Sequence, residues 1–191
     1  KKQQEFFATG TTLQVSFRLE ALGILEEAIL KYQDNIQEAL RKDLGKSAFE
    51  SYMCETGLTL SEIRYMKRHL RSFSREKRVH TPLAQFPSRS FQKPVPYGTV
   101  LIMSPWNYPF LLSMEPMVDA LAAGNKVILK PSAYSPSVSA VMEKLIHEFF
   151  PPRYVAMIPG GRKENIYLLR KRFDYMFFPG STSVGKPVMK Q

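Results

Sequence analysis

The stretch from Pro96 to Pro131 constrains the fold more than any other part of the chain. It reads PYGTVLIMSPWNYPFLLSMEPMVDALAAGNKVILKP. An apolar run leads into a turn bounded by two prolines, a helical segment follows, and a second apolar run ends at Lys130. Strand, turn, helix and strand in that order predict a βαβ unit, in which ligands bind at the carboxyl ends of the strands. Trp106, Asn107 and Lys130 fall at that edge.

The same alternation continues towards the end of the chain. Apolar runs predict strands over 98–104, 126–130, 154–158 and 175–178, and helical patterns cover 111–123, 137–150 and 164–172, with another helix beginning at 186. Strands of nearly continuous apolar character, separated by helices, are typical of a parallel sheet that is covered on both faces. The fold class is therefore α/β, and residues 98–191 are expected to form a Rossmann-like parallel βαβ sheet.

Residues 1–77 have the spacing of helices. Ser47 with Glu50, and Asn35 with Glu38, resemble capping boxes, and Gly45 is a stop signal between them. The helix after Ser47 is expected to bury one stripe of residues, namely Leu58, Ile63, Met66, Leu70 and Phe73. We expect this helical segment to pack on the sheet.

Residues 78–97 differ in composition because prolines exclude a continuing helix there. The segment from Ser88 to Val95 is compatible with an extended strand. Pro94 cannot donate to a sheet ladder, so this strand is expected at an edge or on an excursion from the main body.

The formal net charge is +10, and basic residues cluster in 64–78 and 162–172. Solvated helix faces explain these clusters better than nucleic-acid binding, because the charges follow no nucleic-acid-binding motif. Cys54 is the only cysteine, which excludes an internal disulfide and fits a reducing, cytoplasmic location. It has no Gly-rich turn or nearby base, so it is interpreted as a packing residue. No apolar run is long enough for a membrane helix.

Four turns after the predicted strands carry candidate chemistry. GSTSVG, residues 180–185, can present backbone N–H groups to a phosphate, although an ordinary strand-to-helix connection is equally compatible with it. Lys130 can bond ribose hydroxyls, or it is a solvated strand-end lysine. Gly160 and Gly161 allow close approach of a ring or phosphate, or form a simple turn. In the Pro105–Pro109 turn, the amide of Asn107 is a neutral donor suited to an oxyanion, or the segment is simply a tight turn with a packed aromatic side chain.

Taken together, these segments resemble the aldehyde dehydrogenase family. The matching pieces are PYGTVLIMSPWNYP, PMVDALAAGNKVILKPS, the glycine pair after the third strand and FDYMFFPGSTSVGK, in the same order and spacing. FESYMCETG and RVHTPLAQFPSRSF are similar to the shorter, class 3-like group, which includes fatty-aldehyde and coniferyl-aldehyde dehydrogenases. The resemblance covers nearly all of this chain but only the first part of a typical member, so the fold is expected to be incomplete.

The resemblance implies oxidation of an aldehyde to an acid with NAD or NADP through a cysteine thioester. It implies that Asn107 is the oxyanion donor. It also implies cofactor contacts for a further set of residues, namely Met103, Ser104, Trp106, Lys130, Gly160, Gly161, Gly180, Ser181 and Val184. A homodimer is expected for the whole enzyme, with 78–97 resembling part of the family's oligomerisation element.

Three departures from the family pattern qualify these expectations. Ala133 stands where many members have a Glu that binds the ribose, and this removes repulsion against a 2′-phosphate. Pro179 replaces a Thr and stiffens the turn before Gly180. The family's nucleophilic Cys and its Glu base lie beyond the segment present here, and Cys54 is in the wrong place to substitute.

Two functions follow from these expectations. In the first, the chain is the cofactor-binding portion of an aldehyde dehydrogenase, truncated before the catalytic domain and inactive alone. In the second, it is a degenerate, non-catalytic dinucleotide-binding or interaction fragment. A basic nucleic-acid binder is a third and weaker alternative.

Overall fold

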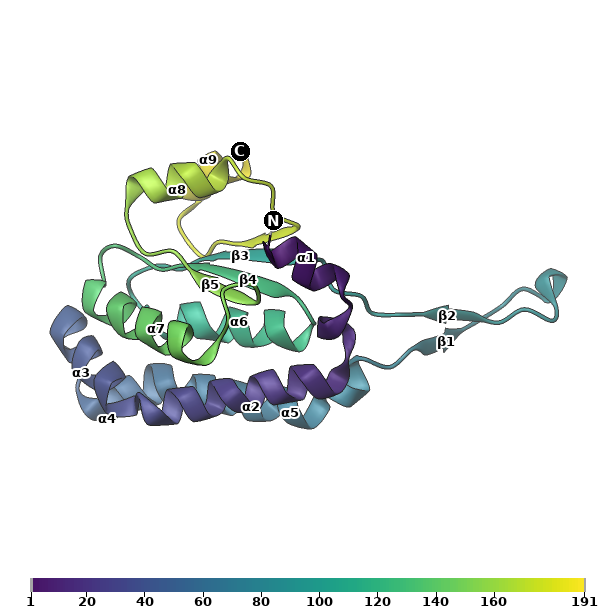
Figure 1. Ribbon diagram of the computed structural model, residues 1–191, viewed down its shortest axis with the longest axis horizontal. Coiled ribbons are helices and arrows are strands. Elements are labelled where there is room, and N and C mark those ends of the chain that lie inside the picture. Colours follow the sequence, from purple (N-terminus) through teal and green to yellow (C-terminus); the bar gives the residue numbers. More distant parts are fainter. Residues whose placement is uncertain (1, 191) are drawn as a thin grey trace.

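The computed structural model describes residues 2–190, which form a layered α/β body and a projecting arm (Figure 1). Four parallel strands make the main sheet in the order β5-β4-β3-β6. Their bounds are Thr99–Met103 for β3, Lys126–Lys130 for β4, Val155–Met157 for β5 and Tyr175–Phe177 for β6. All five residues of β3 are buried, and this strand lies between β4 and β6. The predicted parallel α/β sheet is confirmed.

Helices cover both faces of this sheet (Figure 1). Helices α6 (Leu111–Ala122) and α7 (Pro136–Phe149) lie against one face, and α8 (Arg162–Leu169) and α9 (Thr182–Met189) lie on the other side. Helix α9 begins earlier than the predicted Lys186, because Ser181 has the extended backbone of an N-cap residue and the helix follows it directly. Pro187 is accommodated within its length.

The N-terminal helices form a further layer behind α6 and α7. It is built mainly from α2 (Val15–Lys31), α3 (Gln33–Leu44) and α5 (Gly57–Phe73), preceded by the short α1 (Lys2–Ala8). Leu22, Leu25 and Ile29 of α2 belong to the same buried cluster as Met114 and Met117 of α6. The N-terminal helices and the sheet therefore share one hydrophobic core.

Arg18 links this layer to the sheet region through backbone carbonyls. Its guanidinium donates to Thr12 O at 2.8 Å, to Leu13 O at 2.6 Å and to Ala122 O at 3.3 Å. The residue is only 8% exposed, and burial lowers its pKa from the usual value. Arg18 thus satisfies three carbonyls, one of them at the end of α6.

The helix that follows Ser47 is interrupted by a wider turn. Helix α4 (Ala48–Ser51) runs into a π-helical segment, Tyr52–Thr56, and then into α5. Within α5, Leu60 and Ile63 are buried three residues apart, whereas Leu58, which does not share their face, and Phe73, the last residue of the helix, are 47% and 48% exposed. The stripe predicted for this helix was wrong at those two positions.

The two predicted capping boxes have different outcomes. Ser47 caps its helix, because its hydroxyl accepts from Glu50 N at 3.1 Å. Asn35 does not cap one, because α3 already begins at Gln33, and Glu38 pairs instead with Arg41 at 2.7 Å. Gly45 ends α3 in the left-handed conformation, as predicted.

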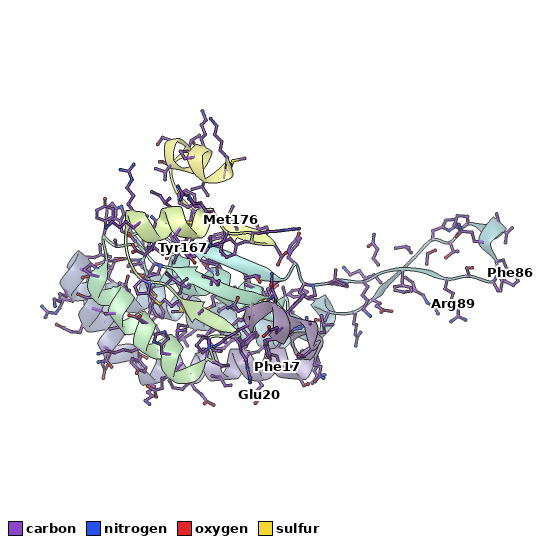
Figure 2. All side chains as sticks on the ribbon, turned by 45° about the horizontal axis from the view of Figure 1, so that its top comes forward. Phe17, Glu20, Phe86, Arg89, Tyr167 and Met176 are labelled. Atoms are coloured by element: carbon purple, nitrogen blue, oxygen red, sulfur yellow. The ribbon has the colours of Figure 1, made fainter. Side chains whose placement is uncertain are left out.

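Strands β1 (Lys77–Val79) and β2 (Ser90–Gln92) form an antiparallel pair that projects from the body (Figure 1). The predicted excursion strand is thus confirmed in a shorter form. Figure 2 shows Phe86 at the tip and Arg89 along the arm. Leu83 and Phe86 are 87% and 81% exposed, so the arm presents large apolar side chains to solvent.

A cavity of about 390 Å³ lies at the amino ends of β3 and β4. Its lining includes Val95, Tyr97, Glu115, Asp119 and Tyr175. Burial raises the pKa of Asp119 to about 6, and the nearby carboxylates of Glu62 and Glu115 contribute in the same direction. This end of the sheet therefore holds an acidic group whose charged form is disfavoured in the folded state.

We predict that Arg18→Met lowers the free energy of unfolding by about 2 to 4 kcal/mol, because it leaves buried carbonyls without a donor. Urea denaturation measures this change. Arg68→Met is the matched control, because Arg68 is exposed, and it should alter stability by less than about 0.5 kcal/mol. Equal effects of the two substitutions would contradict the role given to Arg18.

We also predict that Asp119→Asn stabilises the protein at pH 8 and has little effect at pH 4. The folded-state pKa of Asp119, about 6, lies above its ordinary value of 3.8. The folded state therefore binds the proton more tightly, and stability falls as the pH rises through about 6. Thermal denaturation at the two pH values measures the difference. A larger gain at pH 4 than at pH 8 would contradict the assignment.

Candidate functional site

A second cavity, of about 460 Å³, opens at the carboxyl ends of the strands. Of the residues predicted for cofactor binding, it brings together Met103, Ser104, Lys130, Gly160 and Gly161. The remaining lining comes from the turns that follow β4 and β6 and from the start of α8, namely Pro131, Ser132, Ala133, Tyr134, Phe178, Arg162 and Asn165. The volume falls within the usual range for small-molecule and cofactor sites. Its place at the carboxyl edge of a parallel sheet is where nucleotides bind in doubly wound folds.

Lys130 ends β4 and is almost fully buried, at 3% exposed. Its ammonium donates to Pro131 O at 2.6 Å and to Gly160 O at 2.7 Å. Burial lowers its pKa, while Glu164 acts in the opposite direction. An ammonium has three N–H donors, so one is available to a ligand in the cavity. The protein thus fixes the lysine at the cavity wall, where it does not behave as a solvated strand end.

Gly160 and Gly161 form the turn between β5 and α8. Gly160 has φ of +127°, and a Cβ there would lie 2.6 Å from the side chain of Glu164. The backbone N–H of Gly161 donates to Glu164 Oε2 at 2.7 Å. Hydrogen bonds from the backbone of Glu164 itself and from Gly161 lower the pKa of Glu164. A Cβ at Gly161 would meet nothing within 4 Å. The turn therefore leaves open space at the start of α8.

The turn after β6 stands beside this cavity and does not line it except through Phe178. Gly180, Ser181 and Val184 are exposed. The hydroxyl of Ser181 lies 2.9 Å from that of Ser183 and makes no cap hydrogen bond. Because β6 pairs with β3, this turn shares the carboxyl edge of the sheet with the cavity.

The turn from Pro105 to Pro109 follows β3 at the same edge. Trp106 is 53% exposed, and Asn107 is also exposed. Neither residue lines the cavity, although Met103 and Ser104 immediately before them do. The register pairs Met103 with Lys130, so the turn and the cavity lysine leave the sheet at the same level.

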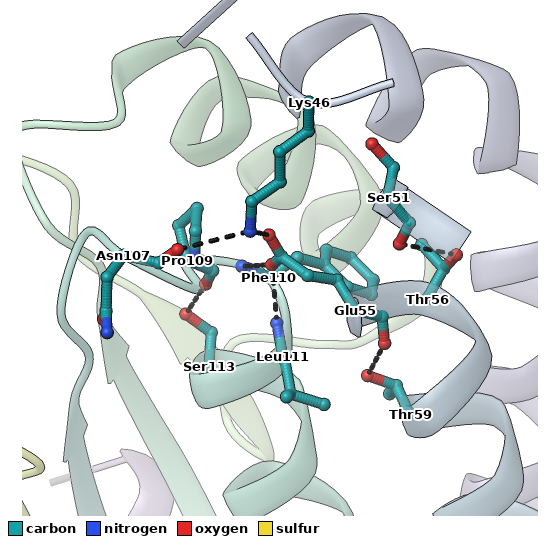
Figure 3. A network of polar contacts seen from close by, with 10 residues as sticks. All are labelled: Lys46, Ser51, Glu55, Thr56, Thr59, Asn107, Pro109, Phe110, Leu111 and Ser113. Carbon is teal, nitrogen blue, oxygen red and sulfur yellow. Dashed lines mark hydrogen bonds and ion pairs between the residues drawn. The ribbon is translucent and has the colours of Figure 1, made fainter. Parts of the chain in front are cut away.

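A buried ion pair between Lys46 and Glu55 contacts the backbone of this turn (Figure 3). Lys46 Nζ lies 2.5 Å from Glu55 Oε1, and the two side chains are 9% and 0% exposed. The same ammonium donates to the carbonyl oxygen of Asn107 at 3.2 Å and lies 4.2 Å from the ring centroid of Tyr108. The side-chain amide of Asn107 points away from Lys46. The backbone of Asn107 is thus held while its amide stays free to bind.

The other carboxylate oxygen of Glu55 binds the start of α6. Glu55 Oε2 accepts from Phe110 N at 2.8 Å and from Leu111 N at 3.1 Å. A carboxylate at a helix N-terminus satisfies unpaired N–H groups and interacts favourably with the helix dipole. Glu55 therefore joins the turn, α6 and Lys46.

Two serines hold the inner side of the turn. Ser113 Oγ donates to Pro109 O at 2.5 Å and lies 2.6 Å from Ser104 Oγ. Both serines are buried. The end of β3, the turn and the first turn of α6 therefore form one hydrogen-bonded unit.

Sequence reasoning did not identify Lys46 or Glu55. They lie far from the turn in sequence, and the ESYMCETG segment around Glu55 reads as an ordinary helix. The one signal was Gly57, a glycine inside a helical pattern, where a Cβ would lie 2.7 Å from Tyr52 O. Cys54 neighbours Glu55 in the π-helical segment, is partly buried and does not line the cavity.

The cavity residues fit a nucleotide cofactor. Lys130 keeps a free donor, the turn after β5 is open, and Arg162 adds a positive charge at the start of α8.

No helix between residues 2 and 190 is long and apolar enough to cross a membrane.

Comparisons with known proteins show which family the sequence and the fold resemble. A sequence model described as "Aldehyde dehydrogenase family" matches residues 2–191. The chain is 47% identical to 4,4'-diaponeurosporen-aldehyde dehydrogenase of Staphylococcus aureus, over 96% of this chain and 40% of that protein. It is 39% identical to human aldehyde dehydrogenase family 3 member B1, over 99% of this chain and 40% of that protein.

Among solved structures, the substrate-bound state of Staphylococcus aureus AldH matches with a TM-score of 0.96 and 46% identity. The match covers 99% of this chain and 41% of that one. This chain therefore spans about 40% of the length of the relatives it matches. With a family match across nearly its whole length, the chain belongs to the aldehyde dehydrogenase family.

Proposed function

We propose that the protein containing this chain oxidises an aldehyde to a carboxylic acid with NAD or NADP. In this proposal, the chain supplies the cofactor cavity and the oxyanion donor, and the nucleophile comes from another part of the polypeptide. The observation that carries the proposal is the position of Asn107. Its backbone is held by Lys46, at the edge of the sheet where the cavity with Lys130 also opens.

The role of Asn107 follows from the charge that develops on the aldehyde. When a nucleophile attacks the carbonyl carbon, the carbonyl oxygen becomes negative and needs donors already aimed at it. The Asn107 amide has two N–H donors and does not titrate, so it offers the same stabilisation over a wide pH range. A bound nicotinamide cofactor would accept the hydride that the substrate carbon loses. Met103, Ser104 and Lys130 would hold that cofactor beside the turn, with Trp106, Gly180, Ser181 and Val184 near its path.

The cavity chemistry supports binding of NADP as well as NAD. Ala133 places no carboxylate beside Lys130, and Arg162 stands on the same cavity wall. A phosphate on the ribose 2′-oxygen is attracted by both cations, because arginine and lysine pair with phosphate through charge-assisted hydrogen bonds. We therefore propose that these residues accept a 2′-phosphate.

The arm supports assembly with a second copy of the chain. Leu83, Phe86 and Phe91 are each more than half exposed, and the arm extends away from the body (Figure 1). Large exposed apolar side chains on an extended element are typical of protein–protein contacts. A homodimer joined through this arm is the assembly that we propose for the whole protein.

We predict that Asn107→Ala in the full-length protein lowers kcat about a hundredfold or more, because an oxyanion donor is lost. The KM for the cofactor should change little, since Asn107 does not line the cavity. Steady-state aldehyde oxidation measures both constants. Asn35→Ala, on an exposed face of α3, is the control and should leave kcat unchanged. An unchanged kcat for Asn107→Ala would remove this residue from the reaction.

We predict that Ala133→Glu shifts cofactor preference towards NAD, because the new carboxylate repels a 2′-phosphate and can accept from ribose hydroxyls. The ratio of kcat/KM for NADP to that for NAD measures the shift. Ala140→Glu adds the same charge on an exposed part of α7, outside the cavity, and should not change the ratio. If the ratio also stayed constant for Ala133→Glu, the ribose would bind elsewhere.

A further inference from the structure

We propose that Lys46 and Glu55, aimed by the π-helical segment Tyr52–Thr56, position the Asn107 turn for catalysis. The inference rests on the proposed function of Asn107 and adds residues from the N-terminal helices to the site. Neither lysine nor glutamate reaches the reacting atoms in this account. Both act through the backbone of the turn.

The ion pair between Lys46 and Glu55 is costly to bury. Both side chains are almost completely removed from water. Burying two charges costs several kcal/mol for each ion, so a buried pair is weak support for stability alone. Here the pair also makes contacts that fix geometry. The Lys46 ammonium binds Asn107 O, and the Glu55 carboxylate binds two N–H groups of α6.

Several backbone atoms of the Asn107 turn and of the start of α6 are held by hydrogen bonds to side chains. Asn107 O is fixed by Lys46, Pro109 O by Ser113, and Phe110 N and Leu111 N by Glu55. These hydrogen bonds hold the carbonyl group of Asn107 and the backbone of the residues that follow it. Its side chain makes no contact in Figure 3. A displacement of about 1 Å in a reacting group can lower a rate about a hundredfold, so a held backbone matters for a donor of this kind.

The π-helical segment orients the side chain of Glu55. Gly57 N donates to Tyr52 O, the bond that closes the π turn. A Cβ at Gly57 would lie 2.7 Å from that carbonyl oxygen and 3.1 Å from the Tyr52 ring. Glycine at this position therefore permits the wide turn, and the wide turn directs Glu55 at the start of α6. π turns inside α-helices occur frequently at functional sites.

The test uses Lys46→Met, with Lys126→Met as its matched control. Lys46→Met removes the contact with Asn107 O and leaves Glu55 bound to the two N–H groups of α6. Lys126 is also buried, at 1% exposed, and its ammonium lies over the Phe7 ring at 4.4 Å. It stands at the opposite end of the sheet from the turn, at the start of β4.

Two measurements are made on each variant. Trp106 is the only tryptophan of the chain and adjoins Asn107, so quenching of its fluorescence by acrylamide reports on the turn. In the full-length protein, its signal is obtained as the difference between each variant and the same variant carrying Trp106→Phe. In the full-length protein, we expect Lys46→Met to lower kcat about tenfold to a hundredfold, with the cofactor KM unchanged. Quenching should change for Lys46→Met and stay as in the wild type for Lys126→Met.

Gly57→Ala provides a second variant that alters no charge, so the inference can be tested even if Lys46→Met does not fold. It should change both readouts in the same direction as Lys46→Met. Gly23→Ala is its control, because a Cβ at Gly23 in α2 has ordinary space, with Lys67 Nζ at 3.9 Å.

The outcomes separate this inference from the proposed function. Wild-type quenching together with wild-type kcat in Lys46→Met overturns the inference. A lower kcat with unchanged quenching also overturns it, because the turn has not moved. Changed quenching with unchanged kcat shows that the pair holds the turn and overturns the proposed role of Asn107.

Discussion

The arrangement of the candidate site depends on the buried contact between Lys46 and Glu55. This pair connects the loop before α4 and the π-helical segment to the start of α6 and to the turn after β3. Without it, the turn would be joined to the N-terminal helices by packing alone. Because both charges are removed from water, each must keep its partners, and the partners include the backbone of the Asn107 turn. Because the buried Lys46 ammonium needs its partners, including the carbonyl oxygen of Asn107, the ion pair restricts the position of the turn.

The sheet supplies the second constraint. Strands β3 and β4 end in register at Met103 and Lys130, so the residues that follow them leave the sheet side by side. The cavity forms there because the turns after β4 and β5 are built from Lys130, Pro131 and the glycine pair, which leave room above the strand ends. One edge thus holds the exposed Asn107, which we propose as the oxyanion donor, and a cavity whose residues fit a nucleotide. The opposite end of the sheet has a cavity lined by the carboxylates of Glu115 and Asp119, which is a different chemical environment.

Local patterns in the sequence predicted much of this fold. The apolar runs of β3 and β4, the helix that ends at Gly124 and the stop at Gly45 each depend on neighbouring residues, and each was predicted correctly. The gathering of Met103, Ser104, Lys130 and the glycine pair also followed from a general rule for parallel sheets. The grouping is observed, and the ligand contacts of these residues stay a prediction.

Other features were not predictable because they depend on distant contacts. The pairing of Lys46 and Glu55 with the turn joins residues more than fifty positions apart, and no periodicity encodes it. Leu58 and Phe73 were assigned to the core wrongly, because Leu58 lies off the face that Leu60 and Ile63 share and Phe73 is the last residue of α5. Asn35 failed as a cap because α3 begins at Gln33.

The central claim is that this chain holds Asn107 where the aldehyde oxygen becomes negative. The most direct measurement is a crystal structure of the full-length protein with cofactor and an aldehyde bound. The account predicts that Asn107 Nδ2 lies about 2.7 to 3.1 Å from the carbonyl oxygen, as for other oxyanion donors, with Lys46 still bound to the Asn107 carbonyl. An aldehyde oxygen beyond hydrogen-bond distance of Asn107 Nδ2, with the cofactor seated against Lys130, would contradict it.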